Sequence, residues 1–240
     1  MAEYHKRAAK KSNKLWKDPI VRKRRIDGIK NLQILCNKCH SKQHEKHNSR
    51  NNIFIEGDLL RGVRLILHGL RLNLNDKNFI GTPERVVRSY YEIFEGLNTT
   101  QEIEEILSST FPSNYTGIVT ETNIKCFSVC PHHLLPIEYT IHIGYIPDKQ
   151  ILGLSKLPRM IELLAKKPQL QETFTQEICH TIEKYLKPKG VIVIVKGRHF
   201  CMVMRGIKKD TLTITSSVSG IFLKSPKGKN PKDEFLKMID

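Results

Sequence analysis

The chain has 240 residues, of which 39% are hydrophobic and 27% charged, a composition that suits a folded protein and excludes a wholly disordered one. The formal net charge of +16 is concentrated at the N-terminus, where residues 1–52 carry 15 Lys or Arg against 4 Asp or Glu. A cationic segment poor in apolar residues favours polyanions, so nucleic acid is the first partner to consider for it.

The chain shows no secretory segment and no apolar run of about 18 residues, so we expect a cytoplasmic protein that does not enter a membrane. In a reducing compartment, clustered cysteines are metal ligands more often than disulfides. The six cysteines are Cys36, Cys39, Cys126, Cys130, Cys179 and Cys201.

A linker, "NSRNN" at 48–52, predicts a boundary between a basic N-terminal arm, residues 1–52, and a folded domain, residues 53–240. The domain begins with two predicted helices, at 56–74 and 82–97. The second has Thr82 as its candidate N-cap and Pro83 at the first helical position. A short helix is predicted within 101–109.

The rest of the domain alternates between strand and helix patterns. Strands are predicted at 117–129 and 137–147, where β-branched and aromatic residues are frequent. Two helices follow within 155–186, separated near Pro168, and two further strands occupy 190–206 and 211–220. This order predicts an α+β fold rather than a regular βαβ repeat.

A cysteine and two histidines stand together in "CPHHLLP", residues 130–136. Cys130 and His133 are three apart, a spacing common in zinc sites, and Cys201 lies in a later predicted strand. Two thiolates and one imidazole leave a fourth tetrahedral position for water, which is typical of catalytic zinc. These residues predict a Zn2+ site.

An ordinary structural role is the alternative for each of these residues, because a lone cysteine is usually a small buried hydrophobe. A second pair argues against that alternative. His199 and Cys201 are two apart on the predicted strand, so both side chains are expected to point into one site.

From about Glu56 onward the sequence closely resembles GTP cyclohydrolase I, the zinc enzyme that opens the imidazole ring of GTP. The resemblance lies in "TPERVVRSYYEIFEGL", "FSVCPHHLLP", "YIPDKQILGLSKLPRMIELLAKKPQLQETFTQEI", "RHFCMVMRGI" and "EFLKMI", in family order and spacing. It implies a tunnelling fold (T-fold), in which two N-terminal helices precede an antiparallel sheet with helices packed on one face. The implied products are 7,8-dihydroneopterin triphosphate and formate, for pterin, folate or deazapurine biosynthesis.

The resemblance implies that Cys130, His133 and Cys201 are the zinc ligands, that His132 is catalytic, and that His199 protonates the purine ring. These roles suit the chemistry. Hydrolysis at C8 needs a hydroxide and a less electron-rich ring, and imidazole titrates in the right range for that proton transfer.

Recognition of GTP is implied at further positions. Glu172 corresponds to the residue that reads guanine, whose N1–H and N2–H a carboxylate can accept as a fork, and Gln171 is a further substrate contact. The triphosphate needs cations and backbone donors at a helix start. Its implied contacts are Ser155, Lys156, Arg159 and Arg205, with Arg85 and Arg88 from a neighbouring subunit.

One position departs from the family pattern. The family has glutamate after the first zinc cysteine, whereas this chain has Pro131, which lacks a charge and a backbone donor. We expect either reduced turnover or a compensating feature in the loop. A relative of the same fold acting on a deazaguanine is the second enzymatic interpretation, but that reaction would not need all three zinc ligands.

Family members form toroidal homodecamers with sites between subunits, and long strand runs would leave open edges in a monomer. We therefore expect residues 53–240 to form a ring-like homo-oligomer, with the basic arm outside it.

The N-terminal arm contains a second cluster, "CNKCHSKQHEKH", which resembles the closing half of an HNH endonuclease domain. No cysteine precedes Cys36, and His5 is the only upstream histidine, so half of the metal site is missing. A nuclease, a nonspecific nucleic-acid-binding arm and a remnant of a mobile element are the alternatives. The competing hypothesis for the whole chain is a nucleic-acid-binding or homing-type protein with a weakly active or inactive cyclohydrolase body.

Overall fold

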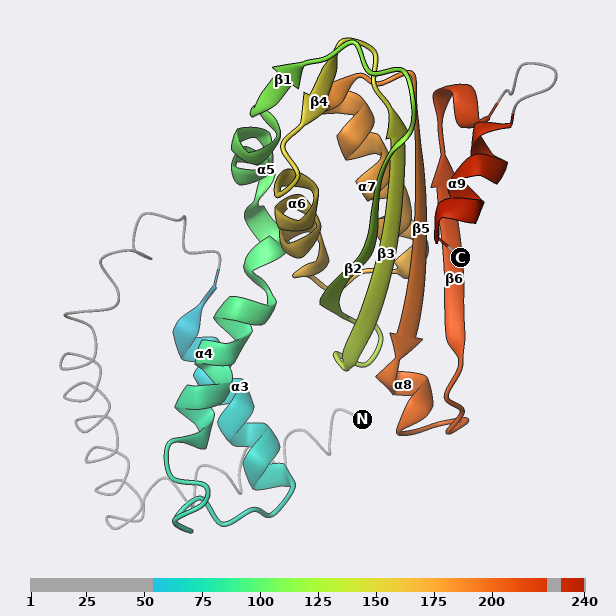
Figure 1. Ribbon diagram of the computed structural model, residues 1–240. Helices are drawn as coiled ribbons and strands as arrows, with labels where there is room; N and C mark the ends of the chain where they lie inside the picture. Colours follow the sequence, from blue (N-terminus) through green and yellow to red (C-terminus); the bar gives the residue numbers. More distant parts are fainter. Residues whose placement is uncertain (1–53, 224–229, 240) are drawn as a thin grey trace, which may run out of the picture. The chain divides into compact units, whose positions relative to one another are not determined.

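A four-stranded antiparallel sheet carries the core of the computed structural model, which describes residues 54–223 and 230–239 (Figure 1). Its order is β2-β3-β5-β6, and a separate antiparallel pair is formed by β1 and β4. The strands are β1 (Thr110–Pro112), β2 (Val119–Val129), β3 (Pro136–Ile146), β4 (Gln150–Leu152), β5 (Gly190–His199) and β6 (Leu212–Val218).

Helices precede the sheet, connect its strands and follow it, so the predicted α+β class is confirmed. The two helices predicted between 155 and 186 are separate, and the break falls around Pro168 as expected. The helices are α3 (Glu56–Gly69), α4 (Thr82–Ile93), α5 (Thr100–Leu107), α6 (Lys156–Ala165), α7 (Gln171–Leu186), α8 (Phe200–Val203) and α9 (Pro231–Ile239), with 3-10 turns η1 (Glu95–Asn98) and η2 (Gly220–Phe222).

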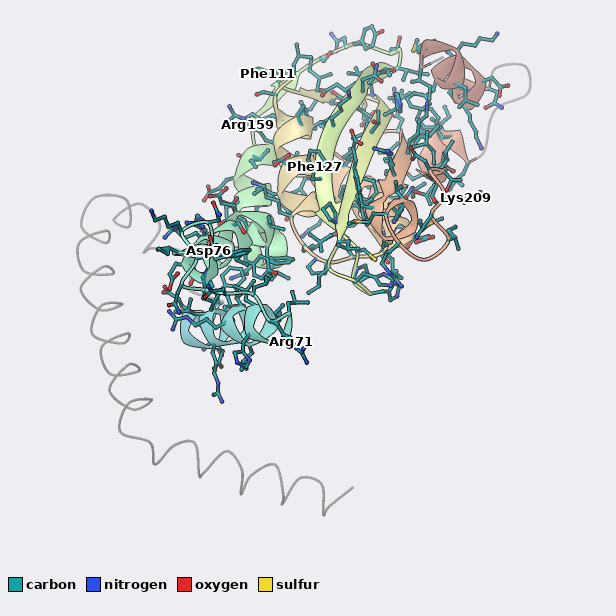
Figure 2. All side chains as sticks on the ribbon, turned by 90° about the horizontal axis from the view of Figure 1, so that it is seen from below. Arg71, Asp76, Phe111, Phe127, Arg159 and Lys209 are labelled. Carbon is teal, nitrogen blue, oxygen red and sulfur yellow. The ribbon has the colours of Figure 1, made fainter. Side chains whose placement is uncertain are left out.

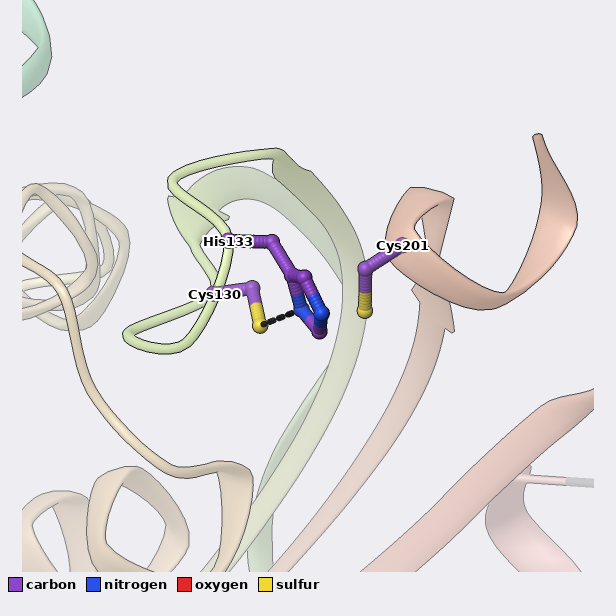
Figure 3. Close-up of side chains that lie close together, drawn as sticks. All are labelled: Cys130, His133 and Cys201. Carbon is purple, nitrogen blue, oxygen red and sulfur yellow. Dashed lines mark hydrogen bonds between the residues drawn. The ribbon is translucent and has the colours of Figure 1, made fainter. Parts of the chain in front are cut away.

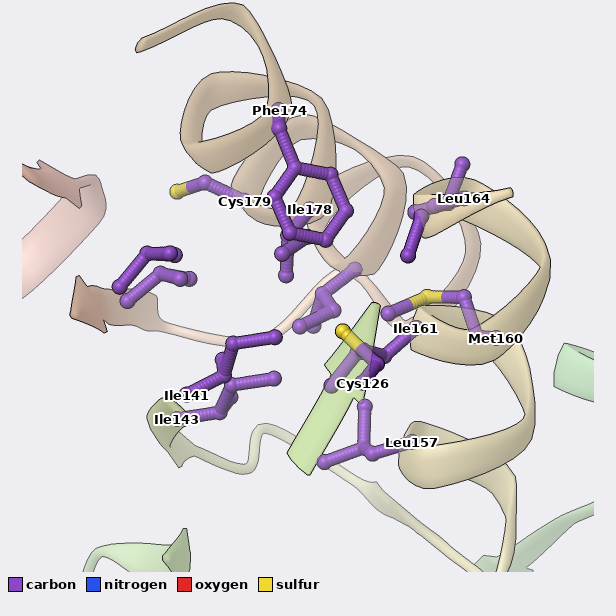
Figure 4. Packing of buried hydrophobic residues seen from close by; sticks show 14 of the residues in the cluster. Cys126, Ile141, Ile143, Leu157, Met160, Ile161, Leu164, Phe174, Ile178 and Cys179 are labelled. Atoms are coloured by element: carbon purple, nitrogen blue, oxygen red, sulfur yellow. The ribbon is translucent and has the colours of Figure 1, made fainter. Parts of the chain in front are cut away.

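The main hydrophobic core lies between one face of the sheet and helices α6 and α7 (Figure 4). Strand residues alternate between the two faces, so Ile141 and Ile143 of β3 point toward the helices. Leu157 and Ile161 of α6 meet them, and Phe174 of α7 completes the layer with an exposure of 0%. The apolar spacing of both helices is thereby buried, as amphipathic helices require.

The helices α6 and α7 cover one face of the sheet, as predicted. The opposite face carries a further helix, α9, which the prediction did not place there. Phe235 of α9 is fully buried and clusters with Ile192 and Ile194 of β5. Gly144 of β3 leaves room for this ring, because an added Cβ would lie 2.6 Å from the Phe235 Cδ2 atom. Figure 1 shows α9 across the sheet from α6 and α7.

The start of α4 corrects one prediction. Thr82 is the first helical residue, and Gly81 is the N-cap in a left-handed conformation (φ 73°). Glycine adopts this conformation at little cost, and the Thr82 hydroxyl instead accepts a hydrogen bond of 2.8 Å from Arg85 Nη2. The helix predicted from residue 56 also ends early, at Gly69, and Arg71 then has a positive φ of 58°.

The predictions for the basic arm, its HNH-like cluster and the boundary at residue 52 fall outside the described residues. Within the described ranges, no helix is both long and apolar enough to cross a membrane.

Candidate active site

Three potential metal ligands converge at the end of the sheet where β2 turns into β3 (Figure 3). Their ligand atoms, Cys130 Sγ, a ring nitrogen of His133 and Cys201 Sγ, all lie within 4.8 Å of one another. Cys130 and His133 come from the connecting loop, and Cys201 approaches from α8. The structure therefore brings together the three residues that the sequence predicts as ligands.

Backbone hydrogen bonds shape the loop that holds Cys130 and His133. The Cys130 amide donates to the Leu135 carbonyl, and the Leu134 amide donates to the Cys130 carbonyl, both at 2.9 Å. Leu134 takes a positive φ of 52° to close the turn. Pro131 is the first residue of the turn that follows Cys130, a place where proline is common.

Cys201 does not lie on a strand, so that prediction is wrong. β5 ends at His199, which pairs with Ile137, the second residue of β3. The pairing of β5 with β6 stops one residue earlier, at Arg198. Without a neighbouring strand to pair with, residues Phe200–Val203 form the short helix α8. This turn, rather than strand alternation, points Cys201 toward the loop.

The geometry of the cluster fits a zinc ion. At bond lengths of about 2.3 Å to sulfur and 2.1 Å to nitrogen, tetrahedral zinc holds the two ligand atoms about 3.6 Å apart. The Cys130 Sγ to His133 Nδ1 distance is 3.6 Å. Burial, together with the neighbouring Cys130 thiol, raises the pKa of Cys201. A bound cation would favour the thiolate forms that coordinate metal.

His199 lies beside this cluster at the end of β5. Its Nε2 is 2.7 Å from Gln171 Oε1, and its ring meets the ring of Tyr139 edge to face with centroids 6.4 Å apart. Burial lowers the pKa of His199, while the charge of Glu172 acts in the opposite direction. The structure therefore places Gln171, Glu172 and His199 near one another.

Glu172 and His132 are both exposed at this end of the domain. Glu172 is in the first turn of α7, where its carboxylate is free to meet a ligand. His132 lies in the loop, and its ring centroid is 6.3 Å from that of His133. Neither side chain is buried by the single chain.

The predicted triphosphate contacts of α6 lie far from the cluster. Leu152, three residues before Ser155, donates its amide to the Tyr145 hydroxyl at 3.2 Å. Tyr145 is at the opposite end of β3 from the Cys130 loop, and eight strand residues span about 26 Å. Figure 2 likewise shows Arg159 and Lys209, beyond α8, on opposite sides of the domain.

The remaining cationic residues predicted to bind the triphosphate lie on two different parts of the domain. Arg205 is exposed just after α8, and its charge acts on Cys201. Arg85 and Arg88 are exposed on α4, where the Arg85 guanidinium donates to the carbonyl of Ile80 at 2.9 Å. One chain therefore brings the metal ligands and His199 together but leaves most triphosphate contacts elsewhere.

A cavity of about 690 Å3 runs along the outer face of α7 and reaches Pro131. Leu170, Thr173 and His180 are among its lining residues, and none of the predicted site residues lines it. The candidate site is therefore not part of this cavity.

Tyr139 is a neighbour of the site that sequence reasoning missed. Its ring stacks on Phe174 with centroids 5.0 Å apart, and its fully buried hydroxyl has no hydrogen-bond partner among the described residues. Burial raises the pKa of this hydroxyl. The sequence showed only a tyrosine on the inward face of a strand, which is usual for a core residue.

A comparison with models of known protein families shows which family the chain belongs to. The family model described as GTP cyclohydrolase I matches residues 60–240. The chain belongs to the GTP cyclohydrolase I family. All the predicted site residues lie within the matched range.

Curated relatives from distant organisms are similar to this GTP cyclohydrolase I family member. "GTP cyclohydrolase 1" of Clostridium perfringens is 43% identical over 178 residues, covering 73% of this chain and 95% of the relative. The protein of the same name from Clostridium kluyveri is 40% identical and covers 76% and 98%. That of Drosophila melanogaster is 37% identical and covers 76% of this chain and 56% of the relative.

Proposed function

We propose that the chain is a zinc-dependent GTP cyclohydrolase, which hydrolyses the imidazole ring of GTP to 7,8-dihydroneopterin triphosphate and formate. Family membership supports the reaction class. The observation that carries the zinc dependence is the convergence of Cys130, His133 and Cys201 within 4.8 Å. The product would enter pterin, folate or deazapurine biosynthesis.

The metal would be held by Cys130, His133 and Cys201. When bound, zinc supplies a water of lowered pKa as the nucleophile for attack at C8. His199 lies beside the ligands and is suited to protonate the purine ring, which makes C8 more electrophilic. His132, exposed in the same loop, is suited to further proton transfer.

Glu172 is the proposed reader of guanine. Its carboxylate is exposed in the first turn of α7, near His199. Two adjacent N–H donors on the guanine edge match the two carboxylate oxygens, whereas adenine presents a different pattern. The position of Glu172 beside His199 would bring the base and the proposed proton donor together.

A second copy of the chain is proposed to complete the triphosphate site. Ser155, Lys156 and Arg159 lie at the far end of the domain from the metal ligands, as the length of β3 requires. The β2 and β6 edges, which have no partner strand among the described residues, suit self-association into a ring, with a homodecamer expected. Arg85 and Arg88 would join the phosphates of a neighbouring site.

The alternative, a nucleic-acid-binding protein with an inactive cyclohydrolase body, is not favoured, because the three candidate ligands lie together and Glu172 lies near His199. The basic arm is compatible with nonspecific phosphate contact in addition to the enzyme. A salt-dependent gel shift with and without residues 1–52 measures that contribution.

The decisive experiment is to incubate the purified, zinc-loaded chain with GTP and to measure formate and a pterin chromophore. We expect both products in equal amounts, and none with ATP. Intact GTP in the presence of one zinc per chain would overturn the proposal. Product formed equally well after complete zinc removal would overturn its metal dependence.

A further inference from the structure

The side-chain amide of Gln171 connects His199 to the sheet. Gln171 is the first residue of α7, and its side chain is buried, with an exposure of 2%. Its Oε1 lies 2.7 Å from His199 Nε2. Its Nε2 donates toward three oxygens, which are Val195 O at 3.1 Å, Thr213 O at 2.9 Å and Thr215 Oγ1 at 3.1 Å.

The partners of the nitrogen fix the orientation of this amide. Val195 O and Thr213 O are backbone carbonyls and can only accept hydrogen bonds. A flipped amide would place Oε1 against both carbonyl oxygens, which is repulsive. The network therefore assigns the nitrogen to the sheet and Oε1 to His199.

This orientation determines which nitrogen of His199 carries a proton. Because Gln171 Oε1 can only accept, His199 Nε2 must be the donor in their 2.7 Å contact. The contact is the same for the neutral ring and for the imidazolium. Nδ1 is therefore the nitrogen that remains for exchange with a ligand.

Two neighbouring features maintain the arrangement. At Gly197 an added Cβ would collide with Gln171 Oε1 and lie 2.9 Å from Tyr139 Cε1, so this position requires glycine. Thr175 Oγ1 is 2.7 Å from the Gln171 carbonyl and 2.6 Å from Thr215 Oγ1. With Thr175 donating to that carbonyl, the Thr215 hydroxyl donates to Thr175 and can accept from Gln171.

We propose that Gln171 is a positioning residue, which holds His199 with its proton on Nε2 and presents Nδ1 to the substrate. The inference rests on the proposed function. In that reaction His199 would meet the purine through Nδ1, while its Nε2–H stays bonded to Gln171 Oε1. The implied role of Gln171 as a direct substrate contact is thereby replaced, because protein atoms occupy both ends of its amide.

The proposal predicts that changing Gln171 affects kcat much more than KM. A direct substrate contact would mainly raise KM for GTP, whereas a group that orients the proton donor acts mainly on kcat. Gln171→Met keeps the length of the side chain but removes both polar atoms. We expect kcat to fall about 100-fold with KM changed less than about threefold, since positioned acid–base groups contribute effects of this size.

Matched variants complete the kinetic test. Gln171→Glu retains an acceptor for His199 but sets its second oxygen against the carbonyls of Val195 and Thr213, so we expect it to recover only part of the kcat lost in the methionine variant, at most about tenfold. Gln176→Met, on an exposed position of the same helix, is expected to match the wild type. Zinc content and melting temperature are measured for each variant, and assays are run well below melting. A tenfold rise in KM with unchanged kcat would overturn the proposal.

A readout without turnover distinguishes this proposal from the proposed function. Solid-state carbon and nitrogen NMR of histidine-labelled protein, assigned with His199→Gln, reports the tautomer of His199 directly. We expect Nε2–H in the zinc-loaded wild type and loss of that preference in Gln171→Met and in Gly197→Ala. An Nδ1–H tautomer in the wild type would overturn the positioning role, whether or not the protein acts on GTP.

Discussion

At the scale of residues, the candidate metal site depends on two cysteines that come from different elements. Cys130 is buried in the loop directly after β2, and Cys201 is partly exposed in α8. Each is an ordinary residue in isolation. Only the closure of the β2–β3 loop against α8 brings them together with His133 as candidate ligands.

Cys201→Ser is predicted to abolish zinc binding, because a serine hydroxyl is a poor replacement for a thiolate. We expect ring-opening activity to fall by more than about 100-fold. Changing a residue that only hydrogen-bonds to a metal ligand usually has a smaller effect. Metal analysis of the purified variant checks this. Cys179→Ala, at a buried position outside the cluster, is the control and should retain zinc. Full zinc content in Cys201→Ser would contradict the assignment.

Glu172→Ala is predicted to weaken GTP turnover and remove discrimination against ATP. Each hydrogen bond to a carboxylate contributes about 1.5–3 kcal/mol, so losing a fork predicts a loss in kcat/KM of about 100-fold or more. Steady-state kinetics with both nucleotides measure the change. Glu183→Ala, later on the same helix, serves as the control. Unchanged GTP kinetics in Glu172→Ala would exclude the role.

Glu121 predicts a dependence of stability on pH. Burial raises its pKa from 4.5 to about 7, so the folded state holds the proton more tightly than the unfolded state. The contribution to stability is therefore present below about pH 4.5 and is lost as the pH rises toward 7.

Glu121→Gln should match the wild type in stability at pH 4 or below and exceed it by roughly 2 kcal/mol at pH 8, because the amide does not ionise and solvent screening of this half-buried group reduces the full effect of about 3 kcal/mol. Denaturant unfolding at the two pH values measures the difference. The exposed Glu105→Gln on α5 is the matched control. An equal stability difference at both pH values would show that the ionisation of Glu121 is not its cause.

At the scale of elements, the packing of α9 depends on a glycine in the facing strand. Gly144→Ala would place a Cβ 2.6 Å from the Phe235 ring, so we expect a loss of about 1–3 kcal/mol from overpacking. At Gly62, in the interior of α3, an added Cβ would meet no atom within 4 Å from other elements of the described part of the chain. Gly62→Ala should therefore stabilise the protein by up to about 1 kcal/mol.

Chemical denaturation of the two alanine variants checks this pair of predictions. Opposite signs are expected for the same chemical change, because one glycine is needed for close packing and the other only weakens a helix. Destabilisation by Gly62→Ala would contradict the open space found beside this position. A neutral Gly144→Ala would contradict the packing of Phe235 on the sheet.

At the scale of the whole molecule, the predicted site is incomplete in one chain. The metal ligands and the Ser155 segment lie toward opposite ends of the sheet, and the β2 and β6 edges have no partner strand among the described residues. We predict a ring-like oligomer that light scattering detects. A monomer with full activity would contradict the shared site.

Deletion of residues 1–52 is predicted to leave both the oligomer and GTP turnover unchanged, because the family match begins at residue 60. Light scattering and the formate assay on the truncated chain measure both properties. Loss of activity would show that the basic arm is part of the enzyme.

The sequence predicted those features that depend on neighbouring residues. The strand residues of β3, the apolar spacing of α7 and the break near Pro168 are each local features of the sequence, and all three agree with the structure. The ligand types at Cys130 and His133 are likewise local, since their spacing fits one loop.

Only the tertiary structure decided how distant segments meet. It showed that Cys201 belongs to α8, because pairing of β5 ends at His199. It also showed that the Gln171 amide is held between His199 and the carbonyl of Thr213. Periodicity records whether a side chain is buried, but its partners follow from strand order, from register and from where strand pairing stops. The sequence by itself therefore determined the elements and the ligand types, and the fold decided which residues act together.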